Sequence, residues 1–252
     1  MKKVKKITIF LIFLFLLNAC AKKQYQIKSF EGYLVEMNSS LDNKPDTKML
    51  AHVNSYKNKL DVKMNKIIGE ATVALTKAGT QSVLANFTTD AMKEYATGLW
   101  GTVDFAVINN GGLRTTLNKG QVTVSNIYEI YAFENCLVLL ELSGKNVRQL
   151  FEGFAKNKIE GFSKGVKLTV KNKSIESLSI GDKPLDDNAI YQVVTVDYLA
   201  EGNDNMEALA KAVKYTESNI VLRDAIIDYI KKLTSENKKI NAMPDDRIEI
   251  KD

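Results

Sequence analysis

Histidine is almost absent from this sequence of 252 residues, in which His52 is the only one. A hydrolytic site with two metal ions needs several imidazole and carboxylate ligands that hold the ions about 3.5 to 4 Å apart. One histidine cannot supply them, and the acidic residues are spread along the chain without a ligand-like cluster. A Ser-His-Asp or Cys-His nucleophile would need the same histidine. We therefore predict no catalytic residue, no metal site and no cofactor in this chain, with an all-carboxylate site as the remaining alternative.

Long apolar runs are also missing. The run at residues 7–17 is too short for a transmembrane helix, which needs about 20 apolar residues. It follows four lysines and stops at Leu17-Asn18-Ala19-Cys20, which is the arrangement of a secretory signal peptide. The last four residues resemble the lipobox of bacterial lipoproteins. This resemblance implies that Cys20 carries a diacylglyceryl group, whereas the alternative is an ordinary signal peptide with a chance cysteine.

These features predict how the chain is divided. We expect residues 1–19 to be a lipoprotein signal peptide, residues 20–30 a lipidated tether and residues 31–252 a folded domain. The lipid on Cys20 would hold this domain at a membrane of the bacterial cell envelope, on the periplasmic or cell-surface face. Without residues 1–19 the chain has 31 basic and 30 acidic residues and no basic stripe with interleaved aromatics. Nucleic acid is therefore not an expected partner.

Cysteine is scarce as well. If Cys20 is acylated, only Cys136 remains, and one thiol cannot form an intrachain disulfide. Cys136 lies in an apolar run, which predicts a buried core thiol. His52 lies within a predicted helix, where a surface or packing role is favoured over catalysis. The sequence also has no Walker-type loop and no dinucleotide fingerprint, so the residues alone indicate a binding module.

Hydrophobic periodicity predicts an α+β fold with mixed sheets and flanking helices, because strands and helices alternate irregularly along the chain. The predicted strands cover residues 30–37, 67–75, 103–108, 136–142, 166–170, 175–180, 189–196 and 247–250. The predicted helices cover residues 46–64, 82–95, 125–131, 147–154 and 220–233. The strands at 166–170 and 175–180 are expected to form a hairpin.

One loop has the composition of a binding site. The sequence Asn109-Asn110-Gly111-Gly112-Leu113-Arg114 follows the buried strand at 103–108. Glycine permits backbone angles and close approaches that other residues do not. The Asn109 amide offers donors and an acceptor, and the guanidinium of Arg114 offers a planar fork for phosphate or hydroxyl oxygens. The alternative is a tight turn with a solvent-facing arginine.

Residues 106–114 resemble the central motif of the 5′-nucleotidase C-terminal domain family. Other segments resemble the same family in order and spacing, and the similarity spans about residues 65–250. These segments are Ser82-Val83-Leu84-Ala85-Asn86-Phe87 with Asp90-Ala91-Met92, residues 124–133, Leu142-Ser143-Gly144-Lys145, and residues 191–196 with Tyr198-Leu199-Ala200 and Gly202-Asn203-Asp204.

The resemblance implies roles for individual residues. Phe133 and Tyr198 match the two aromatic rings that sandwich the nucleobase in this family, and their alternative role is ordinary core packing. Asp204 matches the acid that accepts hydrogen bonds from the ribose hydroxyls. Asn109 and Arg114 match groups that hold the sugar and phosphate end of the nucleotide. Lys77 lies near the position of a substrate-binding arginine in many members.

The sequence also departs from the family pattern. Gln81 stands where an acid is usual before Ser82, and Ala85 stands where glycine is usual. The last loop reads Gly202-Asn203-Asp204-Asn205 instead of Gly-Gly-Asp-Gly. Asparagine tolerates left-handed backbone angles better than most residues, so this loop can keep the family shape.

Full-length family members carry a metallophosphatase domain with two divalent metals ahead of this domain. Only about 45 residues separate Cys20 from the first matching strand, too few for such a domain. We therefore expect a divided 5′-nucleotidase: this chain binds a nucleoside or nucleoside monophosphate, and a metallophosphatase partner holds the two metals and hydrolyses the phosphate ester. The alternatives are a stand-alone nucleoside-binding lipoprotein without hydrolase activity and a scaffold that has lost its pocket.

Overall fold

The computed structural model describes residues 25–43 and 45–251 and divides the chain into two units. One unit ends at His52 and the other begins at Val53. Cys20 and the predicted signal peptide lie outside the described residues. Within these residues no helix combines the length and the apolar character that crossing a bilayer requires.

The first unit has little regular structure among its described residues. The predicted strand at 30–37 is wrong: these residues are exposed and form neither strand nor helix. Alternating apolar residues favour a strand only where a neighbouring strand pairs with them. A short 3-10 helix, η1 (Ser39–Asn43), follows, and helix α2 (Thr47–Met64) crosses into the second unit.

The predicted N-terminus of α2 is confirmed. The Asp46 carboxylate accepts hydrogen bonds from the backbone amides of Lys48 and Met49 at 2.9 and 3.0 Å. These bonds satisfy two amides that have no partner inside the helix. None of the residues of α2 is buried, so this helix contributes nothing to the core.

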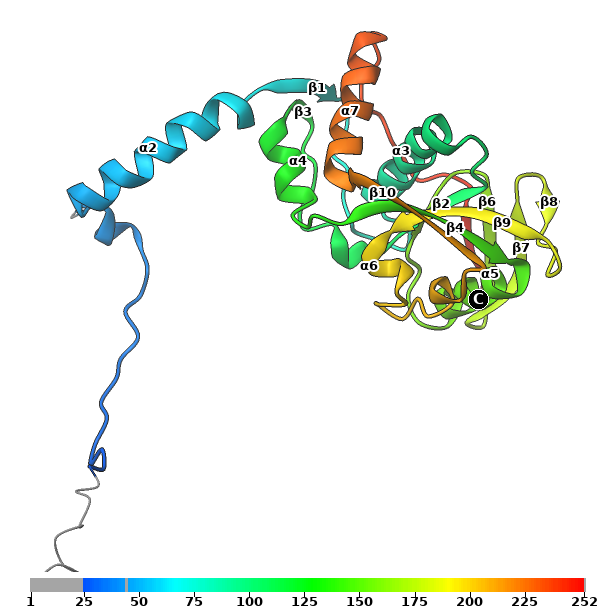
Figure 1. Ribbon diagram of the computed structural model, residues 1–252, viewed down its shortest axis with the longest axis horizontal. Coiled ribbons are helices and arrows are strands. Elements are labelled where there is room, and N and C mark those ends of the chain that lie inside the picture. Colours follow the sequence, from blue (N-terminus) through cyan, green and yellow to red (C-terminus); the bar gives the residue numbers. More distant parts are fainter. Residues whose placement is uncertain (1–24, 44, 252) are drawn as a thin grey trace, which may run out of the picture. The chain divides into compact units, whose positions relative to one another are not determined.

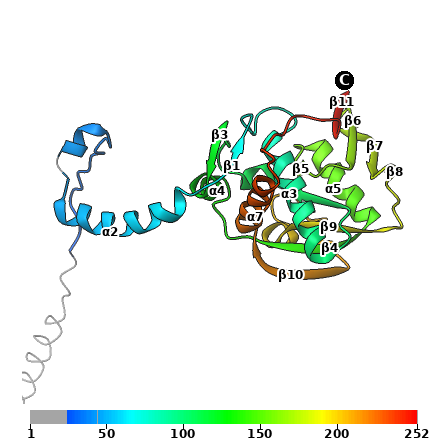
Figure 2. The same ribbon diagram turned by 90° about the horizontal axis from the view of Figure 1, so that it is seen from above.

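A five-stranded sheet lies at the centre of the second unit (Figures 1 and 2). Its strand order is β10 (Lys214–Val221), β4 (Cys136–Ser143), β9 (Ile190–Val196), β2 (Phe105–Ile108) and β5 (Gly161–Phe162). The β2 and β9 strands are parallel, and every other neighbouring pair in this sheet is antiparallel. The polar edge strand β10 was not predicted, because half of its residues face solvent and its apolar pattern is weak.

The remaining strands form two smaller sheets. One has the order β11 (Ile248–Lys251), β6 (Val166–Lys171), β7 (Ser174–Ile180) and β8 (Lys183–Pro184), and the other pairs β1 (Ile67–Ala71) with β3 (Gly120–Thr123). The predicted hairpin between β6 and β7 is confirmed, and its turn residues Asn172 and Lys173 have φ angles of 50° and 58°. Such left-handed angles are typical of two-residue hairpin turns.

Helices cover both faces of the central sheet. The longest in the second unit are α3 (Val83–Trp100), α5 (Gly144–Lys156) and α7 (Leu222–Ser235), with shorter helical segments at α4 (Val124–Ile130), η2 (Asn110–Gly112), α6 (Asp197–Ala200) and η3 (Leu209–Lys211). On β2, Phe105 packs against Phe151 of α5, with ring centroids 5.8 Å apart. Ile108 lies on the opposite face, near Ala85 of α3. This double cover explains why every residue of β2 is buried.

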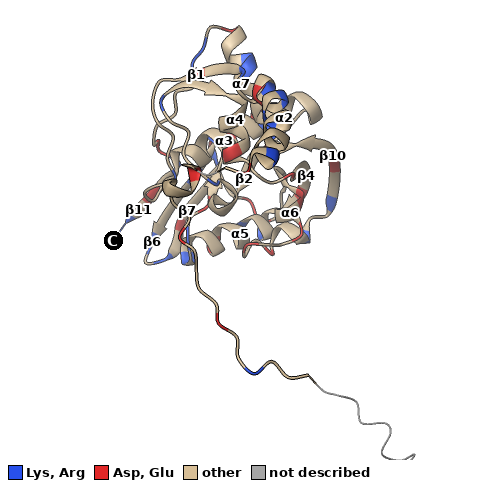
Figure 3. Cartoon of the chain, turned by 90° about the vertical axis from the view of Figure 1, so that its left-hand side faces the viewer, with Lys and Arg blue, Asp and Glu red and all other residues tan. Residues whose placement is uncertain are grey.

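The mixture of parallel and antiparallel pairs with helices on both faces confirms the predicted α+β class. Charged residues are interspersed on the surface of this unit. Figure 3 shows both basic and acidic positions along α7 and along β10.

Candidate functional site

Three strand ends meet at one edge of the central sheet. Because β2 and β9 are parallel neighbours, their carboxyl ends lie side by side, with Ala106 paired to Val194. The β4 strand runs antiparallel to β9, with Leu137 opposite Val196, so its amino end reaches the same edge. The segments that follow Ile108, follow Val196 and precede Cys136 are therefore brought together. These segments carry most of the predicted site residues.

The loop after β2 depends on its second glycine. Asn109 is 6% exposed and has extended backbone angles, and the 3-10 turn η2 follows it. A Cβ atom on Gly112 would lie 2.7 Å from the side-chain oxygen of Asn109. Glycine at this position allows the backbone to fold closely over the Asn109 amide. The Asn109 side chain is thereby held at the strand end.

The Asn109 amide meets the loop that follows α6. Its Nδ2 atom donates a hydrogen bond to Oδ2 of Asp204, and the Tyr198 hydroxyl donates to Oδ1 of the same carboxylate at 3.1 Å. Asp204 and Asn205 have φ angles of 56° and 60°, and Gly202 has a φ of 91°. Asn205 therefore adopts a left-handed conformation, which asparagine tolerates better than most other non-glycine residues. The hydrogen bond to Asp204 raises the pKa of Tyr198, because it stabilises the protonated phenol.

The third segment carries an exposed aromatic ring. Phe133 is 51% exposed and Tyr198 is 41% exposed, so neither ring serves as core packing. The Arg114 guanidinium carbon lies 5.7 Å from the centroid of the Phe133 ring, and Nη1 of Arg114 donates to the Gly111 carbonyl at 3.3 Å. This geometry is a cation–π contact that leaves most guanidinium donors available.

These groups enclose one pocket of about 330 Å³. Its lining residues are Asn109, Gly111, Gly112, Arg114, Phe133, Asn135, Tyr198 and Asp204. Five predicted site residues are therefore brought together from segments up to 95 positions apart. The pocket combines two exposed rings, one carboxylate and one guanidinium, which suits a ligand with a flat apolar part and a polar, anionic part.

Lys77 is the predicted substrate-binding residue that does not line this pocket. Its Nζ atom donates to the Leu113 carbonyl at 2.5 Å, and the residue lines a different hollow with Ser82 and Asn110. Because Leu113 lies between Gly112 and Arg114, the contact ties Lys77 to the backbone of the binding loop. Lys77 therefore supports the backbone of this loop and does not line the pocket.

Sequence reasoning missed Asn135, which lines the pocket. It stands two positions after Phe133, immediately before β4. Its closeness to Phe133 in the chain was the available signal. The prediction for Cys136 was also wrong in degree: the thiol is half-buried because β4 starts at the edge of the sheet. Burial, followed by the charges of Asp197 and Glu134, raises its pKa, so the thiol stays protonated at neutral pH.

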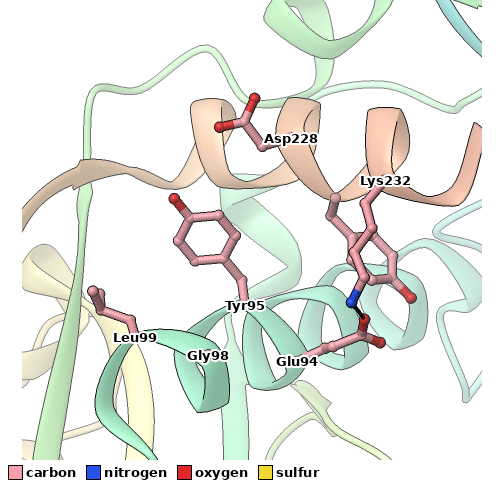
Figure 4. Close-up of a pocket in the computed structure, with 7 residues that line it drawn as sticks. Glu94, Tyr95, Gly98, Leu99, Asp228 and Lys232 are labelled. Atoms are coloured by element: carbon pink, nitrogen blue, oxygen red, sulfur yellow. Dashed lines mark hydrogen bonds and ion pairs between the residues drawn. The ribbon is translucent and has the colours of Figure 1, made fainter. Parts of the chain in front are cut away.

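A larger hollow of about 410 Å³ lies between α3 and α7 (Figure 4). It is lined by Glu94, Tyr95, Gly98, Leu99, Asp228, Tyr229 and Lys232. Lys232 and Glu94 form an ion pair at 2.6 Å, so these two charges are already satisfied by each other. By volume alone, this hollow would be preferred over the pocket at the sheet edge as a candidate binding site. The convergent polar groups select the smaller pocket at the sheet edge, because they supply directional recognition.

Within residues 25–43 and 45–251, no group of three or more histidine, cysteine, aspartate or glutamate side chains is placed to hold a metal ion. His52 lies in α2, far in sequence from the pocket residues. The residues that line the pocket can contribute stacking, hydrogen bonds and charge.

Comparison with known proteins gives consistent matches. The sequence pattern of the family described as 5′-nucleotidase, C-terminal domain, matches residues 66–211. Protein UshA of Yersinia enterocolitica is 26% identical over 181 residues, which cover 70% of this chain and 32% of UshA. A 5′-nucleotidase of Vibrio vulnificus is 25% identical over 195 residues, which cover 75% of this chain and 35% of that protein.

A solved structure agrees with these matches. The crystal structure of a 5′-nucleotidase precursor from Thermus thermophilus superposes with a TM-score of 0.71 and 26% identity, covering 81% of this chain and 43% of that chain. The chain thus spans less than half the length of each of these three proteins.

Proposed function

Because this chain belongs to the 5′-nucleotidase C-terminal domain family, we propose that it is the nucleoside-recognising part of a 5′-nucleotidase that works with a separate metallophosphatase. The observation that carries the proposal is the pocket at the sheet edge. In it, the exposed rings of Phe133 and Tyr198 accompany a carboxylate and a guanidinium.

The two rings suit a nucleobase. A base has two apolar faces, and each stacked aromatic contact contributes about 1 to 3 kcal/mol in single-stranded nucleic-acid sites. The rings are about half exposed without a ligand, so stacking would remove apolar surface from water. Stacking is tolerant of base identity, and hydrogen bonds from Asn135 would have to add any preference.

The polar groups suit the sugar and phosphate. The Asp204 carboxylate accepts bonds from Asn109 and Tyr198, and a carboxylate has about four acceptor positions, so two remain for ribose hydroxyls. Arg114 has one bond to a carbonyl and presents the rest of its fork for a phosphate.

Hydrolysis requires chemistry beyond the pocket. We propose that the partner metallophosphatase holds two divalent metals, which activate water and stabilise the transferred charge. The partner would receive a nucleotide whose base and sugar are already fixed by this chain, and such positioning contributes to rate. The family's two metals are thus assigned to the partner, in keeping with the absence of a candidate ligand cluster among the described residues.

We also propose that the protein is lipid-anchored through Cys20 to the bacterial cell envelope. Replacement of Cys20 by serine should release the protein from the membrane fraction of cells that express it. Mass spectrometry of the wild-type amino terminus should show an acylated Cys20. A wild-type protein with an unmodified Cys20 in the soluble fraction would refute the anchor.

The central experiment has two arms. Isothermal titration calorimetry with adenosine, AMP and UMP measures binding by the purified chain. A phosphate-release assay with Mg²⁺, Mn²⁺, Zn²⁺ or Co²⁺ is then run with this chain alone and with a purified secreted metallophosphatase from the same organism. We expect nucleoside binding, no hydrolysis by this chain alone, and hydrolysis by the mixture.

Variants define what each result means. Phe133→Ala and Tyr198→Ala should each weaken adenosine binding by about tenfold, since each removes one stacked face. Tyr95→Ala, in the hollow between α3 and α7, is the matched control and should leave binding unchanged.

Binding without stimulation of the metallophosphatase would instead favour a stand-alone binding lipoprotein. No heat with any ligand would favour a scaffold, and hydrolysis by the pure chain would overturn the division of labour.

A further inference from the structure

The ring of Phe133 is carried by an irregular segment. Residues 131–135 connect α4 to β4 and belong to neither helix nor strand. Such backbone has no ladder of hydrogen bonds of its own, so its position depends on contacts from elsewhere in the fold. Phe133 lies at the middle of this segment and is 51% exposed, so its own side chain does not anchor it in the core.

The start of α7 supplies those contacts. Arg223 is only 7% exposed, and its Nη1 atom donates to the Tyr131 carbonyl at 3.3 Å. Its Nη2 atom forms an ion pair with Oε1 of Glu134 at 3.5 Å. The two nitrogens of one guanidinium thus contact the chain on either side of Phe133. Next to Arg223, the backbone amide of Leu222 donates to the Asn135 carbonyl at 2.9 Å.

Arg223 is itself held in place. Its guanidinium carbon lies 4.0 Å from the centroid of the Tyr128 ring on α4, which is a close cation–π contact. The planar fork explains why arginine suits this position, because a lysine ammonium is a single point of charge and cannot span two partners in the same way. The Nε atom is buried without a partner, so the contacts with Tyr128 and with residues 131–135 must compensate for burial of the charge.

A second contact fixes the first residue of the segment. The Tyr131 hydroxyl and the Thr88 hydroxyl of α3 are hydrogen-bonded at 2.7 Å, and both are buried. Tyr131 is therefore held through its ring by α3 and through its carbonyl by α7. Phe133, between these tethered residues, contacts Arg114 with its exposed ring.

We propose that Arg223 is a positioning residue of the nucleoside pocket, which fixes the Phe133 ring in its stacking position before the base arrives. Arg223 does not line the pocket and would not touch the nucleoside. The inference rests on the proposed function of that pocket. Fixing one side chain in advance removes an ordering cost of about 0.5 to 1.5 kcal/mol from binding, which corresponds to a change in affinity of up to about tenfold.

The test compares two equally buried arginines. Arg223→Lys keeps the charge but not the fork, and Arg247→Lys makes the same change in an arginine that is 3% exposed and contacts Asp90, Asp245 and the Phe162 carbonyl. Both proteins carry 4-fluorophenylalanine in place of Phe133. Fluorine NMR of the ligand-free proteins reports the environment of the ring, and calorimetry with adenosine and AMP reports affinity.

We expect Arg223→Lys to shift or broaden the fluorine signal without ligand and to weaken adenosine binding by about two- to tenfold. Arg247→Lys should leave both readouts unchanged while lowering thermal stability. An unchanged signal and affinity in folded Arg223→Lys would overturn the inference.

If Arg223→Lys does not fold, Glu134→Gln takes its place, because the Glu134 side chain is 82% exposed and its replacement spares the core. A fluorine signal and an affinity that both match the wild type would then refute the role of Arg223. If the wild type binds neither adenosine nor AMP, the proposed function fails. The fluorine comparison without ligand still decides whether Arg223 holds Phe133.

Discussion

At the scale of single residues, the pocket depends on a few close contacts between polar groups. Asn109 and Tyr198 both donate to the Asp204 carboxylate, so this acid is oriented from two sides before any ligand is present. Gly112 provides the space that lets the Asn109 amide take part. The geometry of the site is therefore sensitive to changes that add only one or two atoms.

Gly112→Ala tests this sensitivity. The new Cβ atom would lie 2.7 Å from the Asn109 side-chain oxygen, so either the amide or the loop must move. We expect a loss of about 1 to 3 kcal/mol in the free energy of unfolding, measured with urea, together with weaker adenosine binding. Gly111→Ala, whose Cβ would have no neighbour closer than 3.6 Å, is the control. Equal stability of the two variants would contradict the close approach.

The Tyr198–Asp204 hydrogen bond predicts a pH dependence. The bond raises the pKa of Tyr198 above its ordinary value near 10. A group whose pKa is raised on folding contributes stability that is fully present below its unfolded pKa and is lost as the pH rises through the folded pKa. The loop should therefore stay closed up to about pH 10 and open above it, where phenolate and carboxylate repel each other. Ultraviolet titration of the wild type and of Tyr198→Phe measures this, and a Tyr198 pKa of 10 or lower would refute the bond.

At the scale of elements, the turn from β4 into α5 packs closely against the backbone that precedes β9. The turn from β4 into α5 begins at Gly144, whose added Cβ would lie 1.9 Å from the Asp186 carbonyl oxygen. That oxygen belongs to the backbone just before β9, the neighbour of β4. The turn and the pairing of β4 with β9 are therefore mutually dependent.

Gly144→Ala should destabilise the domain by about 3 kcal/mol or more, since backbone atoms cannot move aside without changing the pairing of β4 with β9. Gly98→Ala, in the exposed part of α3, is the matched control. Its Cβ would have no neighbour within 4 Å, so alanine should stabilise the helix by about 0.5 to 1 kcal/mol. Urea unfolding of both proteins gives the comparison, and a Gly144→Ala protein as stable as the wild type would contradict the packing.

At the scale of the molecule, the end of the chain returns to close the domain. The Ile240 carbonyl accepts a bond from the Thr72 amide, and β11 adds to β6 as a parallel strand. Between these two points, the buried Arg247 guanidinium donates to Asp90 of α3, to Asp245 and to the Phe162 carbonyl. Figures 1 and 2 show this last stretch of chain running past α3 to β6. Gln81, where the family usually has an acid, is bonded to Asp245 at 2.8 Å in the same cluster.

Arg247→Met should lower the free energy of unfolding by about 1 to 3 kcal/mol, because it removes the partner of two half-buried carboxylates, Asp90 and Asp245, and leaves the buried Phe162 carbonyl without its donor. Burial alone would raise the pKa of Asp245, but the hydrogen bonds and charge of Arg247 outweigh burial and lower it. A lowered pKa gives stability that is present above the unfolded pKa near 4 and is lost as the pH falls through the folded value. The stability difference between wild type and variant, from thermal melts, should therefore shrink below about pH 4. A difference that stays constant in acid would contradict this linkage.

Local sequence was enough for most elements and for the family. The Asp46 cap and the turn at Asn172 and Lys173 act on residues near them in the chain, as do the apolar runs of β2 and β4. These elements can therefore be predicted without knowing the fold. The same holds for the 106–114 motif, which identified the family. The local sequence pattern gave a wrong prediction where a strand needs a neighbouring strand to pair with. Residues 30–37 have the composition of a strand, but no strand lies beside them.

The tertiary structure alone decided which residues share a pocket. Asn109, Phe133 and Tyr198 meet because β2 runs parallel to β9 and β4 runs against it, a pairing that depends on contacts far apart in sequence. The same long-range packing tied Lys77 to the backbone of the binding loop, added Asn135 to the pocket and brought Arg223 to the residues on either side of Phe133. Sequence determines the chemical groups because these are covalent and local. The fold determines which of these groups become neighbours, because side chains from distant strands and helices meet only when those elements pack together.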